Sequence, residues 1–146
     1  MRFTPVPYAS LNARQKENYN FHHLAARLSE YGYHAIPLSD DWNGADLIAV
    51  HVADDEVLRV QLKGRLTIAK KYLGRGLYVA FRDGGLGWVI YPHDAVAAAL
   101  LDRGDLGRSA SWAERGAYSF PTLSSANRAL LTPYRLPAVP SEGLVI

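Results

Sequence analysis

Hydrophobic positions at helical spacing mark the first part of the chain. Leu24 and Leu28 fall on one side of a helix, and Asn12 precedes them as a residue typical of a helix start. Gly32 stands where a glycine commonly follows the last turn of a helix. The pattern therefore predicts a helix over residues 13–30.

Short segments with β character follow, separated by clusters of Asp, Asn, Ser and Gly. They predict five strands, over residues 33–38, 45–52, 57–63, 77–81 and 87–91. A turn over residues 53–56 makes the second and third strands an antiparallel pair. A turn over residues 82–85 predicts another hairpin from the fourth and fifth strands.

An alanine-rich segment over residues 95–101 predicts a helix that covers one face of the sheet. Asp94 is expected to cap the start of this helix, and Gly104 lies near its expected end. Residues 107–117 carry only weak signals. The order of elements predicts an α/β (α+β) fold, with an N-terminal helix, then a mixed five-stranded sheet with flanking helices.

The last part of the chain predicts a short helix from Ser124 or Ser125 to Leu131, ended by Pro133. The proline-containing tail after it is expected to be extended, either packed on the body or reaching to a partner subunit. The length of 146 residues matches one domain, so we expect a single domain. Its core would span about residues 13–101 and its C-terminal extension about residues 102–146.

Composition excludes several classes of function. The sequence has no cysteine, so it has no disulfide, no thiolate zinc site and no cysteine nucleophile. No apolar run approaches the roughly 18 residues that a membrane span needs, so we expect no membrane partner and a cytoplasmic location. The sequence also has no phosphate-binding loop, no dinucleotide fingerprint and no G-x-S-x-G nucleophile elbow.

The formal charge of +2 is small, but positive charge is concentrated in one stretch. Residues 59–82 contain no Asp or Glu and carry these cations: Arg59, Lys63, Arg65, Lys70, Lys71, Arg75 and Arg82. Such a patch can contact phosphates and make binding sensitive to salt. The alternative is an ordinary solvated basic face.

The hairpin over residues 45–63 brings together residues capable of chemistry. Residues directly opposite each other in an antiparallel pair share a sheet face. A two-residue turn at positions 54–55 would put Asp46 opposite Lys63, whereas one at positions 53–54 would put Asp46 opposite Gln61. Either even loop gathers the carboxylate, the amide and the ammonium on one face, and an odd loop without a bulge would separate them.

The third predicted strand is apolar on its other side, at Leu58, Val60 and Leu62. Its polar side lies in the middle of a sheet, where each unpaired buried polar group costs about 1–3 kcal/mol. These polar side chains therefore need partners, and a metal ion with a phosphate would supply them.

The same residues resemble the core of the PD-(D/E)-x-K nuclease superfamily, which includes restriction enzymes and Holliday-junction resolvases. The resemblance covers about residues 15–91 and rests on a helix with Glu17, the segment Trp42–Asn43–Gly44–Ala45–Asp46, and Gln61–Leu62–Lys63. Ala45 replaces the family's proline, whose role is local shape. Gln61 replaces the acidic residue and removes one negative charge, although some members, including a homing-endonuclease branch, carry glutamine there.

The resemblance implies roles for four side chains and one backbone carbonyl. Asp46, Gln61, the carbonyl of Leu62 and Glu17 would bind Mg²⁺, for which Mn²⁺ can substitute. Lys63 would orient the attacking water and stabilise negative charge on the phosphoryl oxygens. The cations expected to contact nucleic acid are Arg65, Lys70, Lys71 and Arg75.

We therefore expect a metal-dependent endonuclease that hydrolyses phosphodiester bonds in DNA. A homodimer or larger homo-oligomer is expected, because one site cuts one strand. The first alternative is a nucleic-acid-binding module of the same fold that no longer catalyses, which Gln61 supports best. The second is a small α/β interaction protein whose polar hairpin pairs internally.

Overall fold

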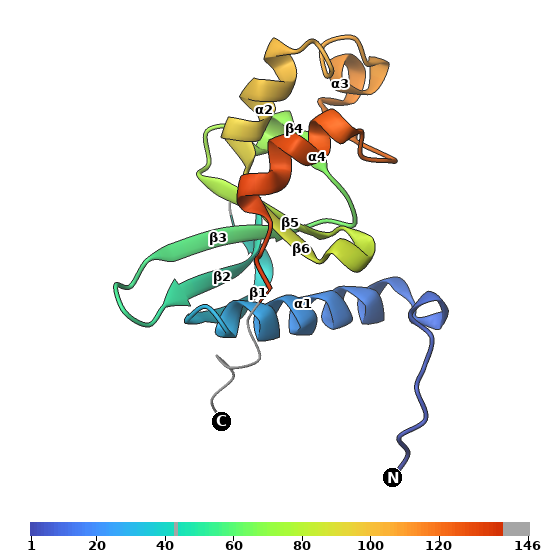
Figure 1. Ribbon diagram of the computed structural model, residues 1–146, viewed down its shortest axis with the longest axis vertical. Coiled ribbons are helices and arrows are strands. Elements are labelled where there is room, and N and C mark those ends of the chain that lie inside the picture. The colour runs from blue at the N-terminus through green and yellow to red at the C-terminus, as the bar shows by residue number, and fades with distance from the viewer. Residues whose placement is uncertain (43, 139–146) are drawn as a thin grey trace.

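The computed structural model describes residues 1–42 and 44–138, and for Asp41 and Trp42 it describes the backbone alone. Asn43 of the resemblance and Pro140 of the tail lie outside the described residues. The chain has a mixed α+β fold with an N-terminal helix and a five-stranded sheet. In Figure 1 helix α1 runs along one side of the sheet, and helices α2, α3 and α4 gather on the other.

Helix α1 spans Ala13–Ser29, one residue shorter than predicted. Asn12 caps it: its side chain accepts from the Gln15 backbone N–H, and the Gln15 side chain accepts in return from the Asn12 N–H. This reciprocal capping box satisfies two of the donors that a helix start leaves unpaired. Leu24 and Leu28, the residues that predicted the helix, are its buried residues.

The five-stranded sheet has the order β1-β2-β3-β5-β6. Strands β3 and β5 pair in parallel and the other neighbours are antiparallel, which makes the sheet mixed as predicted. The strands span Tyr33–Trp42 (β1), Ala45–His51 (β2), Val57–Leu62 (β3), Leu77–Arg82 (β5) and Trp88–Pro92 (β6). All five strands predicted from the sequence are present, with bounds within one residue except in β1.

Strand β1 is longer than predicted, because residues 39–41 continue the strand and do not form a turn. Its pairing with β2 shifts register between Pro37, opposite Leu47, and Trp42, opposite Ala45. The chain reverses after the bulge, where Gly44 has a φ of +88° and an added Cβ would approach Leu77 Cδ1 to 2.8 Å. The polar residues thus mark an irregularity within the strand.

The two faces of the sheet bury different clusters. Leu24 and Leu28 of α1 pack with Leu47 and Val60 on one face. On the other face, Val79 packs in a cluster with residues of α2 (His93–Asp102). Strand residues alternate between these clusters, so both faces of the central strands are covered.

Asp94 does not cap α2, contrary to the sequence prediction. The helix starts two residues earlier, at His93, with Pro92 at the cap position and no side-chain cap. Asp94 Oδ2 instead accepts from the Gly74 N–H at 2.9 Å, and its Oδ1 lies 2.9 Å from His93 Nδ1. Since His93 Nε2 accepts from the Ala69 N–H, Nδ1 carries the proton and donates to Asp94.

A second, two-stranded sheet was missed by the sequence analysis. It pairs β4 (Thr67–Ala69) with β7 (Ala117–Ser119), which follows the short helix α3 (Ala110–Arg115). Strands of three residues are too short to show alternation, and their partners are far apart in the sequence. Single 3-10 turns lie at Tyr8–Ser10 (η1), Lys70–Tyr72 (η2), Gly84–Leu86 (η3) and Thr132–Tyr134 (η4).

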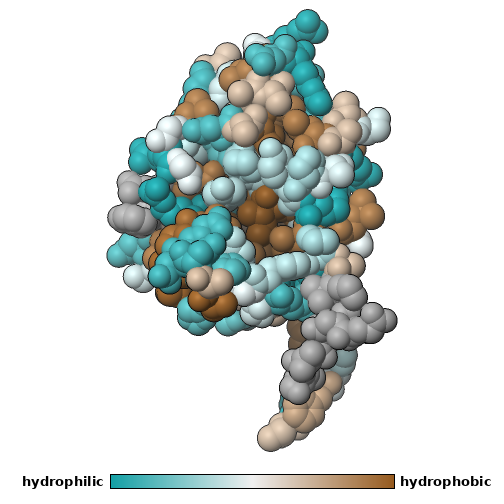
Figure 2. Space-filling model, turned by 60° about the vertical axis from the view of Figure 1, so that its left-hand side comes forward, coloured by the Kyte–Doolittle hydropathy of each residue, from teal (hydrophilic) through white to brown (hydrophobic). Residues whose placement is uncertain are grey.

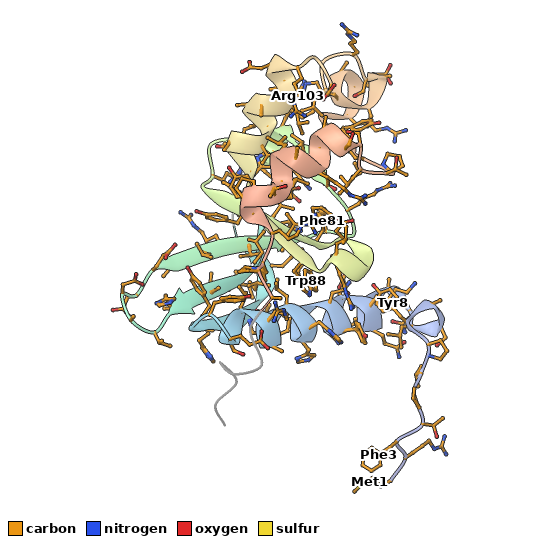
Figure 3. All side chains as sticks on the ribbon, in the orientation of Figure 1. Met1, Phe3, Tyr8, Phe81, Trp88 and Arg103 are labelled. Atoms are coloured by element: carbon orange, nitrogen blue, oxygen red, sulfur yellow. The ribbon has the colours of Figure 1, made fainter. Side chains whose placement is uncertain are left out.

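The end of the described chain packs on the body. Helix α4 spans Ser125–Leu131 with Ser124 as its cap, as predicted. Beyond it the Leu136 N–H donates to the Trp88 carbonyl at 2.9 Å, so the tail runs extended beside β6. At the other end, Met1 and Phe3 are exposed on an arm that leaves the body (Figure 3). No helix in the described chain is long and apolar enough to cross a membrane.

Candidate functional site at the end of the β2–β3 hairpin

The hairpin between β2 and β3 has an even loop. Leu47 pairs with Val60, and the His51 N–H bonds the Glu56 carbonyl at 2.8 Å. Continuing this register by one residue places Asp46 opposite Gln61, which is one of the two arrangements that the sequence allowed. The alternative that pairs Asp46 with Lys63 is excluded.

Asp46 is half-buried where β1, β2 and β3 diverge. It lies between Leu47, which pairs with Pro37, and Ala45, which pairs with Trp42, so the bulge in β1 lies beside it. Its Oδ2 accepts from the Leu62 backbone N–H at 2.8 Å. The carboxylate thus replaces a strand carbonyl at the point where the β2–β3 ladder ends.

Gln61 is half-buried and pairs in parallel with Val79. Val79 belongs to the cluster under α2, so Gln61 and Asp46 lie on the sheet face turned away from α1. The Gln61 side chain reaches the carbonyl of Leu62, with Nε2 at 3.5 Å from that oxygen. Asp46, Gln61 and Leu62 are therefore brought together by hydrogen bonds that all involve Leu62.

Lys63 is half-buried and lies one residue beyond β3, where its backbone N–H still bonds Ala80 at 2.9 Å. Its Nζ stands 5.8 Å from the centre of the Tyr72 ring, a distance that allows cation–π attraction. Lys63 also lines a cavity of about 450 Å³ together with Tyr19 and Asn20 of α1. Lys63 therefore borders open space at the end of β3.

Glu17 is separated from this group. It is exposed on α1, which covers the sheet face opposite to Asp46 and Gln61. The cavity that Lys63 lines is bordered by Tyr19 and Asn20 but not by Glu17. Within residues 1–42 and 44–138, no group of three or more His, Cys, Asp or Glu side chains is arranged to hold a metal ion.

The predicted nucleic-acid contacts are exposed, and aromatic rings support two of them. Lys70 Nζ lies 5.0 Å from the Trp112 ring centre and Lys71 Nζ lies 5.2 Å from that of Tyr72. The Arg75 Nε donates to the Lys71 carbonyl at 2.7 Å, and Arg65 is exposed just beyond β3. These contacts orient the side chains and leave their charges at the surface.

Sequence reasoning missed most of the cavity lining. Tyr8 lies in η1 and Tyr19 in the first half of α1, while Arg82 and Trp88 lie on either side of the β5–β6 turn. Figure 3 shows Trp88 between the sheet and α1, with Tyr8 near the start of that helix. Only Arg82 carried a signal, as the last cation of the basic stretch.

A buried polar network lies behind the site. The hydroxyl of Tyr91 donates to the Thr67 carbonyl at 2.7 Å and accepts from the Thr67 N–H at 3.0 Å. Burial raises the pKa of Tyr91, so its hydroxyl stays protonated. The hydrogen bond from His93 lowers the pKa of Asp94. This network fixes β4 against β6 and α2.

No protein-family model matches the chain, and no curated protein matches it. A solved structure that resembles it is Hjc, a Holliday junction resolvase from the archaeal hyperthermophile Archaeoglobus fulgidus. The two are 16% identical, with a TM-score of 0.40, over 49% of this chain and 74% of the resolvase chain.

Proposed function

We propose that this protein is a metal-dependent endonuclease that hydrolyses phosphodiester bonds in DNA. The observation that carries the proposal is the hairpin register, which puts Asp46 opposite Gln61 and leaves Lys63 at the open end of β3. A carboxylate, an amide oxygen and an ammonium at one strand end are the groups that phosphodiester hydrolysis uses.

The oxygen donors at this strand end fit a hard divalent cation. Asp46 offers a carboxylate, Gln61 a side-chain carbonyl and Leu62 a backbone carbonyl, and hydrogen bonds already hold the three residues together. Mg²⁺, or Mn²⁺ in its place, would be held by these atoms, and Glu17 would need to approach from α1 to join them. A bound cation lowers the pKa of a coordinated water and neutralises charge on a phosphate.

Lys63 supplies a positive charge, which the oxygen ligands cannot provide. Its ammonium stands at the border of the cavity, where it orients a water and stabilises negative charge on the phosphoryl oxygens. Arg65, Lys70, Lys71 and Arg75 bind the DNA backbone through exposed charges. Because one such site cuts one strand, the active form is a homo-oligomer.

A second candidate is DNA binding without cleavage. The observation that favours it is that Asp46 is engaged with the Leu62 N–H, while the described residues form no acidic or histidine cluster for a metal. If Asp46 is the one carboxylate that binds the metal at this strand end, metal affinity would depend on the phosphate of the substrate.

Nicking of supercoiled plasmid with Mg²⁺ or Mn²⁺, set against an EDTA control, tests the proposal. Asp46→Asn keeps an oxygen for the Leu62 N–H but removes the charge, so it should abolish nicking and leave the free energy of unfolding nearly unchanged. Asp46→Ala removes the acceptor as well and should cost about 1–3 kcal/mol in addition.

Intact nicking by Asp46→Asn would refute the assigned site. Binding of DNA by the wild-type protein with no nicking under either metal would favour the second candidate. Calorimetric titration with Mn²⁺ separates a failure to bind metal from a failure of later steps.

A further inference from the structure

The cavity beside Lys63 is lined by aromatic rings and bordered by cations. Three aromatic residues line it, Tyr8, Tyr19 and Trp88, and two cations border it, Lys63 and Arg82. The amide of Asn20 also faces it and donates to the Tyr8 hydroxyl at 3.1 Å. None of the described residues that line it is acidic. Rings beside positive charges suit a ligand with a flat π-face and a phosphate.

Two of the aromatic rings of the cavity come from η1 and α1. The rings of Tyr8 and Tyr19 meet edge to face with centroids 5.1 Å apart, and Tyr19 stacks on His23 at 4.2 Å. These contacts hold the two tyrosines against the first turns of the helix, so the rings are oriented before any ligand arrives. Preorganised rings lose little conformational entropy on binding.

The size of the cavity narrows the class of ligand. At about 450 Å³ it falls within the range of about 300–1,000 Å³ that small-ligand sites occupy. A phosphate group alone would leave most of this space empty. A base within a duplex is stacked and paired, so it reaches a concave aromatic pocket only after leaving the stack.

A second cavity continues from the first. It measures about 330 Å³ and shares Gly64 and Arg82 with its neighbour, adding Arg65 and Arg128. Its acidic residue, Asp83, is already paired with Arg128 at 3.4 Å and with Arg135 at 3.0 Å. The far wall comes from the C-terminal part of the chain, including α4. The second cavity is therefore cationic and suits the phosphates of adjoining nucleotides.

We infer that the substrate is DNA with an unpaired, single-stranded segment, and that one unstacked base enters the aromatic cavity beside Lys63 while the adjoining phosphates follow Arg82 into the second cavity. This inference rests on the proposed action on DNA. It gives residues 120–123 and Arg128, which line the second cavity, the role of guiding the strand.

Fluorescence anisotropy in EDTA tests the inference with two probes, a labelled 12-nucleotide oligo-dT and a labelled blunt 12-base-pair duplex. The wild-type protein should bind the single strand more tightly. Tyr19→Ala and Tyr8→Ala should each weaken single-strand binding about tenfold, the low end for one base–aromatic stack, and change duplex binding less than about twofold. Tyr19→Phe should retain the wild-type affinity. Circular dichroism checks that α1 still forms.

Tyr31→Ala is the matched control, because Tyr31 lies beyond the other end of α1 and does not line the cavity. It should leave both affinities unchanged. Equal binding of both probes, with no effect of either tyrosine variant, would overturn the inference while plasmid nicking upheld the proposed function. Preferential binding of the single strand without plasmid nicking would uphold the inferred single-strand site and refute cleavage by this protein. Binding of neither probe at low salt would refute both.

Discussion

Lys63 stands where the sheet, α1 and the cavity meet, which makes it the residue whose removal best separates chemistry from folding. Lys63 is half-buried with its Nζ 5.8 Å from the centre of the buried Tyr72 ring, and a cation–π pair in such a setting is worth about 1–2 kcal/mol. Lys63→Ala should therefore abolish cleavage and change the free energy of unfolding by no more than about 2 kcal/mol.

Lys71→Ala is the control for this prediction, because Lys71 lies over the same ring at 5.2 Å and is exposed. It should weaken DNA binding while cleavage at saturating DNA persists. Nicking assays and urea melts of both variants are the measurements. A large loss of stability with unchanged cleavage in Lys63→Ala would assign that lysine a structural role.

Gln61 is the residue where this sequence departs from the acidic member of the family pattern. Gln61→Glu adds a carboxylate beside that of Asp46, and affinity for a hard cation rises with ligand charge. We expect tighter Mn²⁺ binding in a calorimetric titration, with cleavage retained at adjusted metal concentration.

The Gln61 amide also reaches the Leu62 carbonyl, at a long 3.5 Å. If Gln61 serves only to make that hydrogen bond, Gln61→Glu loses the donor and gains an unpaired charge. The free energy of unfolding should then fall by about 1–3 kcal/mol, without a gain in metal affinity. Thermal melts beside the titration distinguish the two results. Failure of both proteins to bind Mn²⁺ would end the nuclease proposal.

Among the elements, α2 depends on a tether at its start. Asp94 accepts from His93 and from the Gly74 N–H, and the His93 bond is the main reason that the pKa of Asp94 is lowered. A carboxylate with a lowered folded-state pKa stabilises the fold above its unfolded pKa of about 3.9, and this stabilisation is lost as pH falls through the folded value. Solvent screens the effect, since the Asp94 side chain is 48% exposed.

Asp94→Asn should thus lower the melting temperature at pH 7, with the difference from wild type shrinking as pH falls below about 4. Asp102→Asn, at the other end of α2, is the control and should show little change at pH 7. A difference between Asp94→Asn and wild type that stays constant down to pH 2 would show that ionisation of Asp94 is not the source of its contribution.

Elements with a long pattern were predicted well, and short or irregular ones were not. The helix with Leu24 and Leu28 and the strands of the five-stranded sheet have enough turns or alternations to be recognised. Strand β4 has three buried residues and no alternation, so its pairing with β7 depends on a partner that a local pattern cannot reveal. The bulge in β1 was mistaken for a turn because turn and bulge favour the same residue types.

At the scale of the whole molecule, five cations of the basic stretch are exposed: Arg65, Lys70, Lys71, Arg75 and Arg82. Figure 2 shows a face that is largely hydrophilic, with hydrophobic residues gathered near its centre. Each cation that contacts a phosphate of duplex DNA contributes about 0.9 to the slope of log binding constant against log salt. Lys70→Gln and Lys71→Gln together should therefore reduce that slope by up to about 1.8.

Arg108→Gln, in an exposed position between α2 and α3, is the control and should leave the slope unchanged. Duplex binding measured from low to high salt provides both slopes. Equal slopes for all three proteins would mean that the basic stretch is a solvated face and not a DNA-binding surface.

The sequence by itself determined the order of the main elements, because periodicity is a local property, and it limited Asp46 to two possible partners across the hairpin provided that the loop is even. Tertiary structure chose Gln61 as the opposite residue and put Glu17 on the helix that covers the other face. It alone assembled the cavity of Tyr8, Tyr19 and Trp88 beside Lys63. A pattern along the chain states which side of its own element a residue occupies, whereas a cavity forms where separate elements pack, and packing is decided by the whole fold.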